Sequence, residues 1–329
     1  MKRFILTYCF LLIGLLIKAQ DPQFTQFFSN PLYLNPAFAG TSVQSRAIMA
    51  SRIEWPSIPG AFQTYSLSYD QFFPLIKSGF GLDVYYDRAG SGGLSTTSAK
   101  VIYAYELKIK RNFYIRPAVN IGYNQRGIDL NRLTFGDQLN TGNPSTAEPI
   151  DLQRKQYFDI GTGALLYTPT YWAGFTFSHL NTPDQSLLND KSPLPMKFSL
   201  HGGYKMRLNH SKALTRDYLF FALNYKAQGK FDQLDLGAYF EHNALTIGLW
   251  YRGLPIVYSK TTGIGRDAIA ILLGWSQNGM KVGYSYDLTI SLLGLNTGGS
   301  HEITITYEWA NKNNKRNARR RRVIPCAKF

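Results

Sequence analysis

The side chains that most often carry catalysis or bind metals are sparse in this chain and form no familiar motif. Five histidines are scattered without the spacing of a metal-ligand set, at His179, His201, His210, His242 and His301. There is no GxSxG motif, and GIGRDA at 263–268 precedes a predicted strand instead of opening a helix. A Ser/His/Asp group that meets only in space stays open. We predict a protein that is not an enzyme and uses no cofactor and no metal.

The strongest charge lies in a basic tail. Residues 310–329 hold eight basic residues and no acidic one. Of the formal net charge of +15, this tail contributes +8 and the first eighteen residues +3, so the rest of the chain keeps only +4. Such a run can bind nucleic acid, an acidic protein face or anionic lipid headgroups, or it can stay solvated. The compartment decides among these readings.

The first nineteen residues have the features of a secretory signal peptide. Lys2 and Arg3 precede the apolar stretch FILTYCFLLIGLLI, and Ala19 supplies a small residue before the expected cut. A membrane anchor would need about 20 apolar residues. The mature chain is therefore expected to begin at Gln20, outside the cytoplasm, and no later segment is apolar enough to predict a spanning helix.

Alternation of apolar and polar residues is the main structural signal beyond the leader. The last alternating stretch has Ile303, Ile305, Tyr307 and Trp309 on one face and Glu302, Thr304, Thr306 and Glu308 on the other. Fourteen stretches approach the ~9–11 residues of a tilted membrane-spanning strand. They are 45–53, 62–69, 80–87, 96–106, 113–123, 157–167, 171–178, 197–205, 217–226, 233–241, 244–252, 267–275, 280–287 and 301–309.

The connections between these stretches alternate in length. Long ones are predicted at 124–156, 179–196, 253–266 and 288–300, and short turns follow 157–167, 233–241 and 267–275. Short periplasmic turns and long outer loops are typical of outer-membrane barrels. We predict an all-β protein with a 14-stranded transmembrane barrel over 45–309 and both termini in the periplasm. Asp83, Glu302 and Glu308 should face the lumen. A soluble β-sandwich is the alternative.

Residues 20–44 fit no strand, yet they are too apolar to stay in water. Three prolines exclude a regular helix. A barrel of fourteen strands is wide enough to need filling. We therefore predict that this segment is a plug inside the barrel, and that a disordered linker is the weaker alternative. The residues assigned to the plug are Phe24, Phe27, Phe28, Asn35, Pro36 and Phe38.

Several stretches resemble the PorP/SprF family of the Bacteroidetes type IX secretion system. They are QFTQFFSNPLYLNPAFAG, RIEWPSIPGAFQTYSLSYDQ, IGYNQRGIDLNRLTFGDQL, AGFTFSHLNTPDQSLL, LPMKFSLHGGYK and VGYSYDLTISLLGLNTGGSHEITITY, and they run from about residue 22 to 309. The resemblance implies an outer-membrane protein that contacts the periplasmic ring and serves secretion or surface attachment of cargo adhesins. One branch of the family is tied to gliding motility. The family barrels also resemble the fatty-acid-channel class.

The two loops that carry much of this resemblance, 124–156 and 179–196, are the predicted cargo-binding loops. The expected ligand is the C-terminal signal domain of a secreted cargo protein. The candidate residues are Arg126, Phe135, Gly136, Asp137, Asn181, Pro183, Asp184 and Gln185. Because Gly, Asn, Pro and Asp are ordinary turn residues, the alternative is that they only fold the loops back into the barrel mouth.

On this topology the basic tail begins in the periplasm, where chromosomal nucleic acid is absent. We predict no nucleic-acid partner, and binding to a periplasmic partner or to outer-membrane lipid. The residues assigned to this contact are Arg319, Arg320, Arg321, Arg322, Cys326 and Phe329. The predicted function is a non-enzymatic anchor for a cargo adhesin at the cell surface. The alternative is a plugged diffusion channel or transporter for small hydrophobic molecules, which would require segment 20–44 to leave a path.

Overall fold

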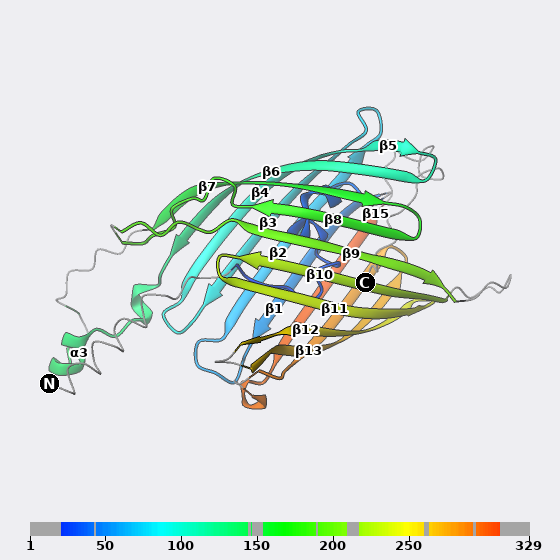
Figure 1. The fold of residues 1–329 in the computed structure, drawn as a ribbon. Helices are drawn as coiled ribbons and strands as arrows, with labels where there is room; N and C mark the ends of the chain where they lie inside the picture. The colour runs from blue at the N-terminus through cyan, green and yellow to red at the C-terminus, as the bar shows by residue number, and fades with distance from the viewer. Residues whose placement is uncertain are drawn as a thin grey trace.

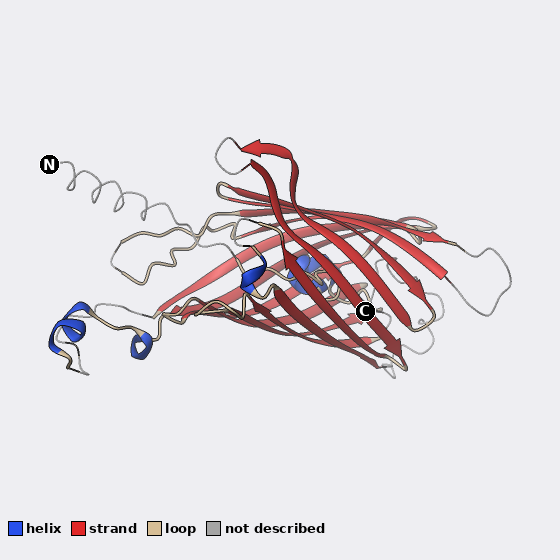
Figure 2. Ribbon diagram, turned by 90° about the horizontal axis from the view of Figure 1, so that it is seen from below, coloured by secondary structure: helices blue, strands red, loops and turns tan. Residues whose placement is uncertain are grey.

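The computed structural model describes residues 21–42, 44–143, 146, 154–188, 190–208, 217–259, 263–291 and 294–309. Within them, one antiparallel sheet curls into a tilted barrel (Figure 1; Figure 2). Its strands are β1 (Ser45–Glu54), β2 (Phe62–Phe73), β3 (Ser78–Ala89), β4 (Leu94–Tyr105), β5 (Leu107–Lys110), β6 (Phe113–Gly127), β7 (Lys155–Tyr167), β8 (Tyr171–Ser178), β9 (Lys197–Arg207), β10 (Asp217–Gln228), β11 (Phe231–His242), β12 (Leu245–Ser259), β13 (Gly263–Gln277), β14 (Met280–Thr289) and β15 (Ser300–Trp309).

The sheet closes on itself, as the sequence predicted. The first strand pairs with the last, from Ser45 opposite Trp309 to Glu54 opposite Ser300. Strands β4 and β5 both pair with β6 and are separated only by Glu106, so they are two parts of one strand. Counted in this way, the described sheet is a closed barrel of fourteen strands.

The alternation in the sequence becomes the two faces of the wall. In β15, Ile303 and Tyr307 are 48% and 52% exposed on the outside, whereas Glu302 is fully buried on the inside. Asp83 is also fully buried, and Glu308 pairs with Lys281 at 3.3 Å. The predicted faces of this strand are therefore confirmed. An apolar exterior around a polar interior is the arrangement that a lipid environment favours.

The two ends of the barrel differ. One end, the loop end, carries the connections 128–154, 179–196 and 290–299. The other, the turn end, carries 74–77, 168–170 and 278–279, together with one longer connection, 208–216. The long loop predicted at 253–266 is wrong, because β12 and β13 continue through it as a hairpin. Register shifts there, between Arg252 and Gly253 and between Leu254 and Tyr258, obscure the alternation in the sequence.

Helical turns are few in the described residues. They are α2 (Pro31–Leu34) and η2 (Pro36–Phe38) before β1, η3 (Leu130–Arg132) and α3 (Gly136–Thr141) after β6, and η4 (Leu295–Thr297) before β15. Figure 1 shows α2 and η2 among the strands, whereas α3 projects well clear of them. No helix in the described part of the chain is long and apolar enough to cross a membrane.

Candidate functional site

Residues 21–42, called here the interior segment, cross the inside of the barrel from one end to the other (Figure 1). At the loop end, the carboxylate of Asp21 lies 2.9 Å from Nε2 of His179, just after β8. At the turn end, the backbone N–H of Gly40 donates to the carboxylate of Asp70 at 2.6 Å. The segment therefore starts at the loop end and leaves at the turn end, where it joins β1.

This course separates the two ends of the described chain. Ser45 and Trp309, where the barrel itself begins and ends, lie side by side at the turn end. Asp21 lies at the loop end, beside Lys197 at the start of β9. The expectation that both termini lie on one side thus applies to the barrel strands but not to the start of the described chain.

Aromatic packing holds the middle of the interior segment. The ring of Phe27 lies 4.7 Å from that of Trp250, and the ring of Phe28 lies 5.5 Å from that of Trp172. Both arrangements are edge-to-face, the geometry that aromatic pairs prefer. All the residues that the sequence assigned to the plug are buried: Phe24, Phe27, Phe28, Asn35, Pro36 and Phe38.

Asn35 connects the segment to the opposite wall. Its side-chain amide donates to the carbonyls of Ala164 and Phe175 at 3.1 and 3.2 Å. The same nitrogen lies 3.0 Å from Nε2 of His201, and the ring of His201 stacks on Phe38 at 5.4 Å. Both residues are fully buried, so these bonds satisfy polar groups that would otherwise be costly inside the barrel.

A buried group of charges holds the segment on the loop-end side. Its members are Arg52, Arg252, Asp287 and Glu302, the charge cluster. The carboxylate of Glu302 accepts the backbone N–H groups of Thr25 and Gln26 at 2.6 and 2.9 Å. Asp287 bridges both arginines, at 2.9 and 3.1 Å. Removing Arg52 would leave the buried carboxylate of Glu302 without its basic partner, which is strongly destabilising.

Arg116 plays the matching role near the turn end. Its side chain is fully buried and donates to the backbone carbonyls of Ala37 and Ala39 and to the carboxylate of Glu106. At Gly79, a Cβ would lie only 1.9 Å from the carbonyl oxygen of Ala39, so glycine is required for this close approach. The segment is thus bonded to the wall at both ends.

The start of the segment is held by titratable groups. Asp21 contacts Nε2 of His179, Nζ of Lys197 at 3.0 Å and the amide of Gln228 at 3.4 Å. Nδ1 of His179 lies 2.9 Å from Asp159. Burial alone would lower the pKa of His179, but the two carboxylates overcome this effect and raise its pKa to about 9. Burial would raise the pKa of Asp21, but Lys197 and His179 hold it well below its usual range.

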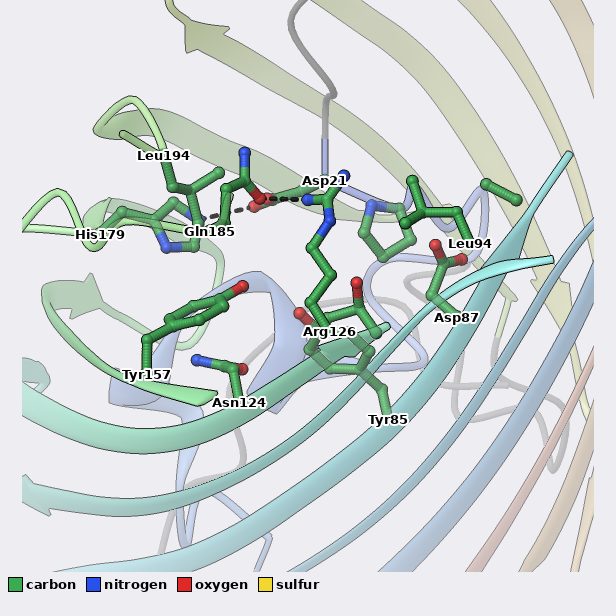
Figure 3. Close-up of a pocket in the computed structure, with 13 residues that line it drawn as sticks. Asp21, Tyr85, Asp87, Leu94, Asn124, Arg126, Tyr157, His179, Gln185 and Leu194 are labelled. Carbon is green, nitrogen blue, oxygen red and sulfur yellow. Dashed lines mark hydrogen bonds and ion pairs between the residues drawn. The ribbon is translucent and has the colours of Figure 1, made fainter. Parts of the chain in front are cut away.

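The contacts of Asp21 with His179 and Lys197 are called here the Asp21 clamp. Beside this clamp, the loop end holds a small cavity of about 60 Å³, the mouth cavity (Figure 3). It lies between the start of the interior segment and the loop ends of β3, β4, β6, β7 and β8. Its polar lining comes from Asp21, Tyr85, Asp87, Thr96, Asn124, Arg126, Tyr157, His179 and Gln185. Figure 3 shows Arg126 reaching from the wall towards Asp21 and Gln185.

The structure brings only part of the predicted cargo-binding set together. Arg126 and Gln185 meet in the mouth cavity, where the guanidinium donates to the side-chain oxygen of Gln185. Asn181 instead bonds to the backbone of β7, donating to Phe158 and accepting from Ile160.

Pro183 and Asp184 form contacts within the loop 179–196 and with the start of β7. The carboxylate of Asp184 accepts from Nζ of Lys155 at 2.8 Å and from the N–H groups of Ser192 and Ser186, which together lower its pKa to about 2. The bridge between Asp184 and Pro193 and the bond from Leu194 to Pro183 close the same loop.

Phe135, Gly136 and Asp137 lie apart from this group. They belong to residues 128–143, called here the loop arm, which extends from the rim through η3 and α3 (Figure 1). Leu139 on α3 is 75% exposed. The predicted set therefore divides into two groups, one at the mouth of the barrel and one on a projecting arm.

Sequence reasoning missed most of the groups that hold the interior segment. Arg52, Arg116 and Arg252 occupy inward positions of alternating strands, and each was detectable as a charge on the polar face. Their partners were not, since pairing depends on strand register. The assigned signal peptide, 1–19, and the tail residues Arg319, Arg320, Arg321, Arg322, Cys326 and Phe329 lie outside the described residues.

A closed antiparallel barrel with an apolar exterior and a polar interior defines the class of membrane-spanning β-barrels of the outer membrane. The sequence narrows this class further. The chain belongs to the PorP/SprF family of type IX secretion system membrane proteins, whose profile matches residues 16–307. The protein is therefore an outer-membrane component of a type IX secretion system.

Solved barrels give more distant likenesses. The Acinetobacter baumannii outer membrane protein Omp33 is 8% identical, with a TM-score of 0.45 over 81% of this chain and 98% of its own. The monoaromatic hydrocarbon channel CymD is 11% identical, with a TM-score of 0.44 over 86% of this chain and 93% of its own. Comparison with curated protein sequences finds none that matches.

Proposed function

We propose that this protein is a permanently filled barrel that anchors a secreted cargo protein at the cell surface. The cargo docks at the loop end, through its C-terminal signal domain. The turn end connects to the periplasmic ring of the secretion system. The family supports a role with this machinery, and the adhesin cargo and gliding role belong to the same proposal.

The observation that carries the proposal is the contrast between the interior and the loop end. The interior segment is bonded to the wall by the charge cluster, by Asn35 and by Arg116. A segment held in this way leaves the end surfaces as the places for function. The loop arm and the mouth cavity then supply a docking surface on one end.

Orientation follows from the usual asymmetry of outer-membrane barrels, in which long loops face outwards. The loop end is then extracellular, so Asp21 lies at the outer surface and Trp309 at the periplasmic surface. The basic tail after Trp309 would meet the ring or anionic lipid headgroups in the periplasm. Protease protection of a tag before Asp21 and of a tag after Trp309 tests this assignment in whole cells.

Deletion of residues 134–139 tests cargo docking. The deletion removes most of α3 and leaves every strand intact. We expect normal barrel assembly and release of cargo from the cell surface into the medium. A matched control deletes a residue pair from the turn end, at 169–170. Cargo that stays attached to a correctly assembled deletion variant would remove the loop arm from the docking surface.

The alternative function is a diffusion channel or transporter for small hydrophobic molecules. It would require the interior segment to move, which breaks the bonds of Asn35, Arg116 and the charge cluster together. Planar-bilayer recordings on the purified protein separate the two functions. We expect no steady conductance, and open channels in the intact protein would favour transport.

A further inference from the structure

The mouth cavity is lined by hydrogen-bond donors that have no partner in the described part of the protein. Among the described residues, neither the amide of Asn124 nor the hydroxyl of Tyr157 has a hydrogen-bond partner, and both line the cavity. Asn124 is only 3% exposed, so its amide is shielded from bulk water. The amide lines the cavity and is not among the fully enclosed polar atoms that lack a partner, so a group that enters the cavity can bond to it.

Arg126 supplies the positive charge of this site. One arm of its guanidinium donates to Gln185, and the rest of the planar fork faces the cavity (Figure 3). Five donors in a fixed plane match the two oxygens of a carboxylate. An arginine beside a tyrosine hydroxyl and an amide is therefore suited to bind a planar anion.

The carboxylates in the lining are already engaged. Asp21 is neutralised by His179 and Lys197, at 2.9 and 3.0 Å. Asp87 accepts from the hydroxyl of Thr64 at 2.7 Å. Asp21 and one oxygen of Asp87 are therefore engaged, and the donors that face the cavity belong to Arg126, Tyr157 and Asn124. Their chemistry selects an anion over a cation.

The volume limits what can enter. A bound water needs roughly 10–15 Å³ of such space, so about 60 Å³ admits a few waters or one carboxylate group. An aromatic ligand or a sugar ring is too large. The ligand must therefore reach in with its tip, while the rest of it stays outside the barrel.

We propose that the mouth cavity is a carboxylate-binding site, which receives an acidic side chain or a C-terminal carboxylate of the protein docked at the loop end. The proposal rests on the proposed function for the identity of the docked protein. The chemistry of the site stands on the cavity alone. Arg126 donates two N–H groups to the two oxygens of the carboxylate, and Tyr157 and Asn124 donate to the same group.

Calorimetric titration of the purified full-length protein with acetate, and separately with inorganic phosphate, tests the site without any cargo. We expect acetate to bind the wild type more tightly than phosphate does. Arg126→Gln should weaken acetate binding about tenfold or more, as loss of a charged hydrogen bond predicts. Tyr157→Phe, which removes one hydroxyl only, should weaken it by a smaller factor.

Arg88→Gln is the matched control. Arg88 lies at the same end of β3 and donates to Gln63 at 2.7 Å, but it does not line the cavity. The Arg88→Gln substitution should leave acetate binding unchanged. Three results would overturn the site. They are acetate binding by Arg126→Gln that equals the wild type, tighter binding of phosphate than of acetate by the wild type, and no binding of acetate to the wild type.

A second measurement follows surface cargo in cells that carry Arg126→Gln or Tyr157→Phe. We expect less cargo on cells whose barrel assembles normally by heat-modified gel mobility. If these variants lose acetate binding but retain all of their surface cargo, the carboxylate does not come from the docked protein. Cargo that never depends on residues 134–139 or on Arg126 would instead contradict the proposed function, while the acetate result would still stand.

Discussion

The interior segment and the loop arm are both irregular stretches of chain built around short helical turns, and they differ in what surrounds them. The segment has α2 and η2 inside the barrel, where Phe24, Phe28 and Asn35 are at most 3% exposed. The arm has η3 and α3 beyond the rim, with Leu139 at 75% exposure. Irregular backbone is stable inside a membrane barrel only where the wall satisfies its polar groups.

The arm satisfies its own polar groups locally. Asp129 pairs with Arg132 at 3.1 Å, and the backbone N–H of Phe135 donates to Gln138 at 2.8 Å. The segment therefore contributes to stability, whereas the arm is available for binding, as exposed loops on rigid scaffolds usually are.

The largest effect should follow removal of the segment. Deleting residues 24–38 takes away its aromatic core, the Thr25 and Gln26 groups that bind the charge cluster, and the Ala37 carbonyl that accepts from Arg116. We expect no assembled barrel in the outer membrane, measured by heat-modified gel mobility and fractionation. The 134–139 deletion serves as the control. An assembled barrel with steady conductance would reduce the segment to a removable plug.

A single core truncation should have the next largest effect. Phe28→Ala removes a buried ring that packs on Trp172 and lies within 6.2 Å of Trp250. We expect a loss of roughly 3–5 kcal/mol in the free energy of unfolding, measured by urea titration in detergent. Leu139→Ala on the arm should change it by less than about 0.5 kcal/mol. Equal effects at the two positions would erase the contrast.

The Asp21 clamp should make stability depend on pH. Because the pKa of His179 is raised to about 9, its contribution is complete below about 6.5 and is lost as the pH rises through about 9. The loss should be on the order of 3 kcal/mol. Unfolding measured from pH 6 to pH 10 should show this decline in the wild type. His179→Gln should flatten the curve over that range, and an unchanged slope would contradict the clamp.

The smallest effect on stability belongs to the arm. Leu139→Asp places a charge on an already exposed position, so the free energy of unfolding should stay within about 0.5 kcal/mol of the wild type. Surface cargo should nevertheless fall, because a charge replaces the apolar side chain of α3. Quantitative immunoblotting of cells and medium measures this. Unchanged cargo would indicate that docking uses the mouth and not the arm.

The sequence predicted what depends on local alternation. The closed barrel, the faces of β15 and the buried aromatic residues of the segment all follow from periodicity and apolarity. The hairpin of β12 and β13 was missed because register shifts near Gly253 break the alternation. Local pattern therefore predicted the strands of the wall, but not the irregular pairing between β12 and β13.

The direction of the interior segment was beyond the sequence. Apolar residues require cover, but they do not specify whether the segment doubles back or passes through. That direction is set by partners far along the chain, such as His179 for Asp21 and Arg116 for Ala39. The alternation of a strand shows which charges face inwards. It does not show their partners, and the pairing of Arg52 with Asp287, 235 residues away, required the fold.

The course of the interior segment also constrains the order of assembly. Asp21 to Ser42 are made before any strand, yet Glu302, which binds Thr25 and Gln26, lies in the last strand. In the folded barrel, the seam between β1 and β15 closes a wall that surrounds the segment. A barrel that sealed first would have to be entered by threading a bulky aromatic chain through its bore, so this arrangement favours closure of the wall around the segment.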